Sequence, residues 1–459
     1  MTDMSSGHTA QIPRPRSSEP TGPGLTSAAG LTPAPGLTAG AVLTVAFGTT
    51  VAMWAVGYIG RLPAVMLPAA GLLGAFLICL VGGGWYIGHR TGAGWKAGAL
   101  AGGVCGLLNL LVLGSLLTGS EPNQIVPSAL WWIPGSVGIS AVLAAVGAAF
   151  AGRQATRGLD WTAGLAGVAV VATMLLLAVG GLVTSTETGL AVVDWPNSYG
   201  YNMFLYPLSR MTGGIYYEHA HRLFGALVGL TTLVLAVFLQ RVETRRWVKG
   251  LGWLALVMVI VQGILGGLRV TGSFTTSTDI ADMAPSITLA VVHGVFGQVF
   301  FALLVALAAI CTTRFREGPA AATRENAATD HTLTAALVGL LILQLVLGAI
   351  QRHTANLLAV HIALACVVAP LAVLVGMRAW GLNDDEPLLK RIGVGLASIT
   401  GLQVMLGMGA FVVTGAIGAT HVSKTVEVSV ATAHQWVGAL MLGCSSLVAV
   451  WSRRLLSKG

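Results

Sequence analysis

Twelve long apolar runs constrain the fold of this chain more than any other sequence feature. Each run is about 18 to 24 residues long, enough for a helix to cross the roughly 30 Å hydrocarbon core of a membrane. Charged residues make up only 9% of the chain, whereas soluble domains carry about 25%. We therefore predict an all-α integral membrane protein with twelve transmembrane helices, at residues 40–59, 65–88, 97–117, 135–152, 162–184, 219–240, 248–268, 288–311, 332–351, 357–379, 391–414 and 429–452.

The positions of Lys and Arg predict the orientation of these helices. Nineteen of the 25 lie in the two termini and the even-numbered connections. The other six are Arg61, Arg210, Arg222, Arg269, Arg352 and Lys424. Because positive charge beside a span is retained in the cytoplasm, both termini are predicted to be cytoplasmic. The net charge of +8 then reflects topology and gives no reason to expect a nucleic-acid partner.

Residues 1–39 contain no apolar run and are rich in Pro, Gly, Ser and Thr, so we expect a disordered cytoplasmic tail. They carry too few Arg for a mitochondrial transit peptide, which favours the plasma (inner) membrane of a bacterium. All five Cys lie within the apolar runs and form no C-x-x-C motif, so we expect them to behave as small apolar residues.

The last eight predicted helices contain an internal repeat that is marked by four histidines. His221 and His293 are 72 positions apart, and His361 and His434 are 73 apart. The offset between the two pairs is 140 for the first members and 141 for the second. The segment Gln262–Gly266 matches Gln403–Gly407 at the same offset, and a third copy is Gln344–Gly348. The repeat predicts two pseudo-symmetric four-helix bundles, at residues 160–311 and 332–455, after a four-helix extension at residues 40–155.

Paired histidines at one depth of a membrane bundle are typical of metal binding. In a soluble core a single helical histidine is more often a hydrogen-bonded filler, but ionisable residues inside a membrane are usually functional. Zinc prefers four ligands, or three and water, and neither half offers that set. Haem iron needs only two axial ligands. We therefore predict that each half binds one haem through two histidines.

The cluster Glu218-His219-Ala220-His221-Arg222 is expected at the start of the sixth helix. Glu218 and His221 are three residues apart, so they share a helix face, although a Glu is also favourable at any helix N-terminus. His219 points about 200° away from His221, and we favour His221 as the ligand because it keeps the repeat offset. Arg222 could pair with a haem propionate or with Glu218, and the sequence does not decide between them.

The connection at about residues 185–217 is the longest on the outer side. Its acids, aromatic residues and glycines could cap a cavity, because long ordered loops are often functional. It could equally be an interfacial segment with Trp195, Tyr199 and Tyr201 as headgroup anchors.

Several of these motifs resemble the haem A synthase family. They are the stretch 180–196, Glu218 to Arg222 followed by Leu223 and Gly225, and Ala433-His434-Gln435 with Gly438-Ala439-Leu440. The resemblance covers about residues 160–455. It implies an eight-helix core that oxidises the C8 methyl of haem O to a formyl group, giving haem A for cytochrome oxidase.

The resemblance also implies roles for individual residues. His221 and His293 would enclose the substrate haem O in the N-terminal half, and His361 and His434 would hold haem b in the C-terminal half. Glu218 would be the catalytic proton acceptor or would stabilise a cationic intermediate. Some family members carry a Cys pair in the outer loops, and its absence here excludes a thiol step.

The expected partners are haem O with the farnesyltransferase that supplies it, membrane lipid, and an electron acceptor of unknown identity, with homo-oligomerisation left open. The four-helix extension lies outside the resemblance, and we expect it to be a helper or partner-binding module. The main alternative function is a bis-haem b membrane cytochrome that carries electrons to or from quinone. It needs the same four histidines but gives no reason for Glu218.

Overall fold

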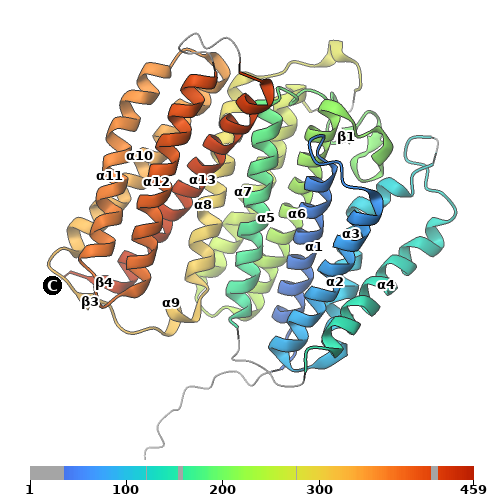
Figure 1. The fold of residues 1–459 in the computed structure, drawn as a ribbon, viewed down its shortest axis with the longest axis horizontal. Helices are drawn as coiled ribbons and strands as arrows, with labels where there is room; N and C mark the ends of the chain where they lie inside the picture. The colour runs from blue at the N-terminus through green and yellow to red at the C-terminus, as the bar shows by residue number, and fades with distance from the viewer. Residues whose placement is uncertain (1–35, 120, 153–158, 275–276, 415–421, 459) are drawn as a thin grey trace, which may run out of the picture. The chain divides into compact units, whose positions relative to one another are not determined.

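The computed structural model describes residues 36–119, 121–152, 159–274, 277–414 and 422–458 (Figure 1). Nearly all of the tail predicted at residues 1–39 lies outside this part of the chain. Twelve of its helices are long and apolar enough to cross a membrane, which confirms the predicted all-α membrane fold. They are α1 (Ala39–Arg61), α2 (Ala69–Thr91), α3 (Gly94–Leu113), α4 (Ala129–Ala149), α5 (Trp161–Ser185), α6 (Gly213–Val242), α7 (Arg246–Thr271), α8 (Ile287–Ile310), α10 (Ala327–Thr354), α11 (Leu358–Gly381), α12 (Pro387–Val413) and α13 (Lys424–Leu455).

The remaining elements of the described residues are short. They are the helix α9 (Thr313–Glu317), the strands β1 (Asn197–Ser198), β2 (Tyr201–Asn202), β3 (Ala322–Thr323) and β4 (Leu456–Ser457), and the 3-10 turns η1 (Gly114–Leu116), η2 (Met203–Leu205), η3 (Leu208–Arg210) and η4 (Ile280–Asp282). β1 pairs with β2 in a small antiparallel hairpin within the α5–α6 connection, and β3 pairs in parallel with β4. Residues 186–212 are called the outer loop, and the end of the helices at which it lies is the outer end.

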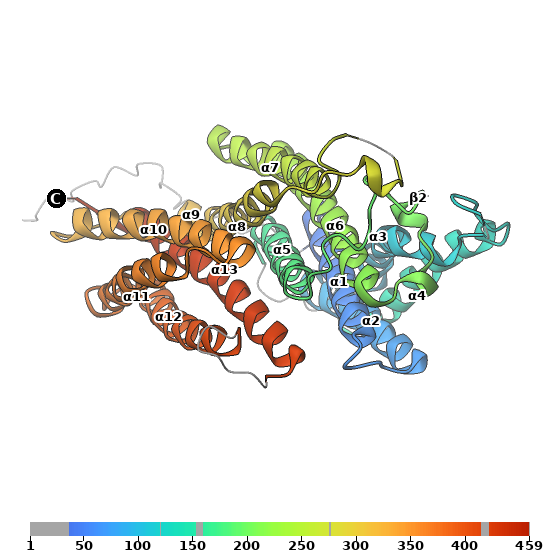
Figure 2. The same cartoon turned by 90° about the horizontal axis from the view of Figure 1, so that it is seen from above.

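The eight helices that follow the extension pack as two rings of four. α5, α6, α7 and α8 contact one another in a ring, and so do α10, α11, α12 and α13. α13 lies across both α5 and α8, which joins the two rings, while α1 packs on α5 (Figure 2). The core of the first ring contains the fully buried side chains of Leu165, Leu227, Phe300 and Leu304. In a membrane such close van der Waals packing, and not the exclusion of water, holds neighbouring helices together.

Helix α6 begins earlier than predicted. Hydropathy placed its start at residue 219, but its N-cap is Thr212 and its first helical residue is Gly213. Glu218 and His219 therefore lie inside the helix, and both are buried. The interpretation of Glu218 as a residue of the first helical turn is wrong. Its buried carboxylate lies too far along the helix to be stabilised by the dipole at the N-terminus, so another group must stabilise its charge.

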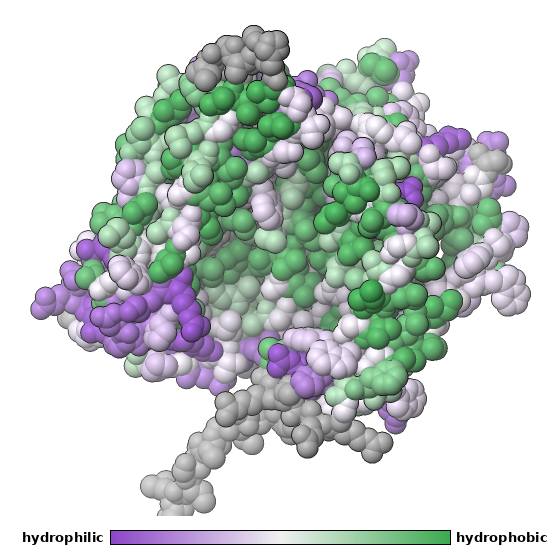
Figure 3. Space-filling model, in the orientation of Figure 1, coloured by the Kyte–Doolittle hydropathy of each residue, from purple (hydrophilic) through white to green (hydrophobic). Residues whose placement is uncertain are grey.

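The surface shows the division expected of a membrane protein. Hydrophobic residues cover most of the middle of the molecule, and hydrophilic residues gather near the C-terminus at the inner end (Figure 3). Large apolar side chains on α4 are exposed, among them Leu130, Trp131 and Trp132. Hydrocarbon tails are as apolar as these side chains, so their exposure is expected on a face that contacts lipid.

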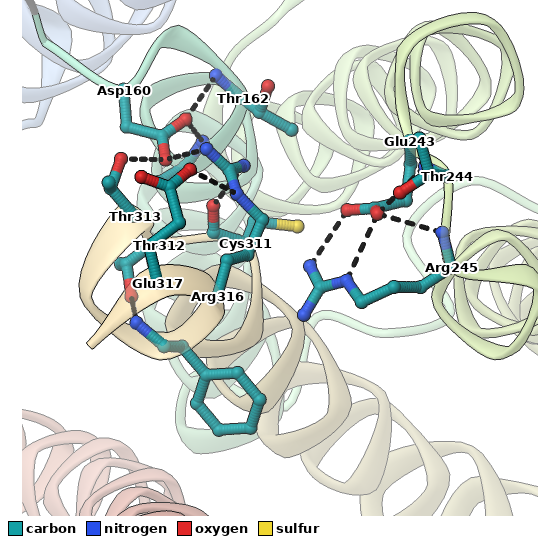
Figure 4. A network of polar contacts seen from close by, with 12 residues as sticks. Asp160, Thr162, Glu243, Thr244, Arg245, Cys311, Thr312, Thr313, Arg316 and Glu317 are labelled. Carbon is teal, nitrogen blue, oxygen red and sulfur yellow. Dashed lines mark hydrogen bonds and ion pairs between the residues drawn. The ribbon is translucent and has the colours of Figure 1, made fainter. Parts of the chain in front are cut away.

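A polar network closes the inner end of the first ring (Figure 4). Arg245 contacts both carboxylate oxygens of Glu243 and donates to the carbonyl of Ile310 at 3.1 Å. Its guanidinium lowers the pKa of Glu243 from 4.5 to about 2. Arg316, just after α8, pairs at 3.1 Å with Asp160, whose side chain also caps α5. These contacts tie the inner ends of α5, α6, α7 and α8 together.

Candidate functional site

The structure brings the four repeated histidines together as two pairs. His221 on α6 faces His293 on α8, with ring centroids 6.3 Å apart and ring planes at 82°. His361 on α11 faces His434 on α13, with centroids 6.4 Å apart and planes at 83°. The two pairs thus have the same geometry, as the sequence repeat predicts.

The spacing of each pair suits one metal ion between two imidazoles. Bonds from a metal to histidine nitrogen are about 2.0–2.1 Å long, and adding the radius of two imidazole rings puts the centroids roughly 6 Å apart. Within the described residues no group of three or more His, Cys, Asp or Glu could hold a metal ion. Two opposed imidazoles without a third protein ligand fit the axial positions of a haem iron.

A glycine on the neighbouring helix makes room for each imidazole. A Cβ atom added to any of these glycines would lie only 2.8–3.0 Å from the Cε1 atom of the facing histidine. The glycine and histidine partners are Gly180 with His221, Gly266 with His293, Gly348 with His361, and Gly407 with His434. Three of these glycines end the repeated Gln-x-x-x-Gly segments, and their contact with histidine explains why the segment recurs.

The glutamines of the repeat position the histidine helices. Gln262 donates from Nε2 to the carbonyl of His293 at 2.9 Å, and Gln344 donates to the carbonyl of His361 at the same distance. In α5 the corresponding position, four residues before Gly180, is Leu176, which cannot donate. Sequence comparison therefore missed the fourth copy, because its glutamine has been replaced.

Glu218 lies three residues before His221 on α6 and is held by two donors. It is 4% exposed. Arg222 donates to its Oε1 at 2.8 Å, and the backbone N–H of Val192 donates to its Oε2 at 2.9 Å. Both oxygens thus have a donor, and the carboxylate is fixed between α6 and the outer loop.

Arg222 is the link between Glu218 and the outer loop. Its guanidinium also donates to the carbonyls of Val192 at 2.8 Å, Asp194 at 2.6 Å and Asn197 at 2.9 Å. The sequence left open whether Arg222 pairs with a propionate or with Glu218. The structure places it on Glu218, with four acceptors in total.

His219 points into the outer loop and away from the histidine pair. Its Nδ1 lies 3.1 Å from the hydroxyl of Ser198, and its ring packs on Tyr206 with centroids 4.9 Å apart. Among the two histidines of the cluster, His221 is therefore the one that faces His293.

The outer loop folds back onto the helices. Asp194 accepts from the N–H groups of Tyr199 at 2.6 Å and Gly200 at 2.8 Å, which shapes the β1–β2 hairpin. Tyr201 is only 3% exposed, and the ring of Trp195 packs against α7 at Gly267. Trp195 and Tyr201 therefore face the protein, whereas Tyr199, the third expected headgroup anchor, is 38% exposed. The loop folds over α6 and α7 at the outer end of the first ring.

Comparison with known proteins agrees with the resemblance. Residues 163–363 match the family model COX15-CtaA, described as cytochrome oxidase assembly protein. The match contains Glu218, His221, His293 and His361, and it ends before His434. No curated protein matches the chain.

Proposed function

We propose, on the premise that residues 163–363 belong to the cytochrome oxidase assembly family, that this protein is a haem A synthase. It oxidises the C8 methyl of haem O to the formyl group of haem A. The observation that carries the proposal is the combination of two equal histidine pairs with a buried carboxylate, Glu218, one turn before a histidine of the first pair. Among the described residues the corresponding position of the second half is Leu358. His221 and His293 enclose the substrate, and His361 and His434 hold haem b.

The difference between the halves favours the synthase over the bis-haem cytochrome. Applying the offset of 140 to Glu218 and Arg222 gives Leu358 and Ile362, so the second half has no charge at either of these positions. A protein that only carries electrons between two equivalent haems has no use for a buried ion pair at one of them, since burying charge is costly.

The residues of the first half prepare the site for proton removal. Converting a methyl into a formyl group removes protons and electrons and adds one oxygen atom, so a proton acceptor or a stabilising anion is required near the methyl. Glu218 supplies the carboxylate, and Arg222 with the Val192 N–H holds it in place. Haem b, when bound, supplies electron transfer.

We further propose that the four-helix extension supports the outer loop. Asn123, in the α3–α4 connection, accepts from the N–H of Asn202 at 2.6 Å and donates to the carbonyl of Gly200 at 3.3 Å. Ser115 donates to the carbonyl of Phe204 at 3.3 Å. Tyr216 of α6 donates to the carbonyl of Tyr58 at 2.6 Å. The extension thereby holds the hairpin whose neighbouring carbonyls bind Arg222.

Asn123→Gly tests this support. Asn123 has a φ of 64°, so glycine removes the side chain without straining the backbone. Loss of two hydrogen bonds should raise amide hydrogen exchange in residues 197–206 by roughly tenfold or more and slow haem O conversion. Glu121→Gly in the same connection is the control. Unchanged exchange in the hairpin would show that the extension does not support the loop.

We place the protein in the plasma membrane of a bacterium with both termini in the cytoplasm, in accordance with the charge pattern. The proposed activity requires haem O from its farnesyltransferase. The experiment that tests the function is conversion of haem O by the purified protein, with the haems extracted and identified by chromatography.

A further inference from the structure

The outer end of the first ring contains a second arginine whose role differs from that of Arg222. Arg269 lies in the last turn of α7, three residues after Gly266, the glycine that contacts His293. Its guanidinium packs against the backbone of the outer loop at Gly189. It is close enough to Glu218, His221 and His293 to interact electrostatically with each of them. Arg269 therefore lies between the outer loop and the histidine pair.

Arg269 has no acceptor of its own in the described part of the chain. No hydrogen bond or ion pair to its guanidinium occurs among those residues, although Arg222 beside it has four acceptors. Glu218 does not supply one, because its two oxygens are taken by Arg222 and by the Val192 N–H. Arg269 is half-buried at the outer end of α7, and a cation in such a place is stabilised by a nearby anion or other acceptor.

The other three helices that carry a glycine facing a histidine have no cation in the corresponding place. Three residues after the facing glycine, α5 has Val183, α10 has Gln351 and α12 has Ala410. In the second half, Arg352 lies four residues after Gly348, but it already donates to the carbonyl of Thr184 at 2.8 Å. The unmatched guanidinium is thus specific to the half that also has Glu218.

We infer that Arg269 is a carboxylate-binding residue and that it binds a propionate of the haem enclosed by His221 and His293. A guanidinium and a carboxylate form paired, charge-assisted hydrogen bonds, which are strong and directional. A propionate held at the outer end fixes the rotation of the macrocycle about the axis between the two histidines. That rotation determines which edge of the ring meets Glu218, so Arg269 selects the methyl that is presented to it. The identity of the ligand as a haem rests on the proposed function.

The test compares two probes, haem b and its dimethyl ester, in which both propionates are neutral. Each probe is titrated into the purified protein with its resident haem, and the added haem is followed by its absorption. His221→Ala, which should abolish this binding, identifies the titrated site. Arg269→Gln should weaken the binding of haem b by roughly tenfold or more and leave the binding of the ester within about twofold. Arg352→Gln, the matched control, should change neither.

Equal weakening of both probes by Arg269→Gln would overturn the inference, because it would show a loss of packing and not of a carboxylate contact. No weakening of haem b would overturn it as well. The absorption spectrum of the resident haem reports whether the variant is folded. Arg269→Lys keeps the positive charge but loses the paired hydrogen bonds of the guanidinium, so it should give an intermediate affinity for haem b. If the wild-type protein prefers haem b to the ester but never converts haem O, the carboxylate site stands and the synthase proposal fails.

Discussion

Replacing Glu218 by Gln is expected to lower the rate of haem O conversion by about a hundredfold or more, while haem remains bound in both halves. Carboxylates that accept a proton or stabilise a developing positive charge contribute about 10²–10⁴ in rate. Gln keeps the size of the side chain and can still accept from the Val192 N–H, and Arg222 keeps its three loop carbonyls. The outer loop should therefore stay in place, while the charge and the contact of Arg222 with this side chain are lost.

The control for this experiment is Glu187→Gln, which removes an exposed carboxylate at the same end of the molecule. It should convert haem O at the wild-type rate. The reaction is followed by chromatography of the extracted haems, and bound haem by absorption. Undiminished product from Glu218→Gln would remove this residue from the mechanism, whatever its contacts.

Replacing His434 by Ala is expected to remove the haem b of the second half and to flatten its low-spin absorption. Haem iron needs two axial ligands, and His361 and His434 face each other with ring centroids 6.4 Å apart. Among the described residues no group of three or more His, Cys, Asp or Glu offers a replacement ligand. His361→Ala should have the same effect. The haem content per chain, measured by extraction, should fall by one in both variants.

His353→Ala is the matched control, because His353 also lies in the second half but in the last turn of α10. It should keep the complete spectrum. Full retention of the low-spin spectrum in His434→Ala would reverse the assignment of the two halves.

Most of the fold could be predicted from the sequence because the membrane imposes a simple requirement. Every span must be a long apolar helix, and all twelve predicted spans correspond to helices in the structure. The start of α6 was misplaced because hydropathy set the boundary at the charged Glu218, whereas the helix extends back to Gly213 and Glu218 is buried. A boundary set by tertiary contacts cannot be read from local composition.

The pairing of the histidines followed from the repeat, but their surroundings did not. Gly180 was missed because Leu176 interrupts the pattern that marks the other three glycines. The partner of Arg222 depends on how residues 192–197 fold back over the helices, which no periodicity reveals. Arg269 was counted only as a charge on the outer side, since its neighbours in space lie on α6, α8 and the outer loop.

The most direct test of the central claim is to express the protein with a supply of haem O, purify it, and identify the extracted haems by chromatography. The synthase proposal predicts haem b together with haem O and either haem A or a hydroxylated form of haem O. Haem b alone at two per chain would contradict it and favour the electron-carrying cytochrome, and a protein without haem would contradict both.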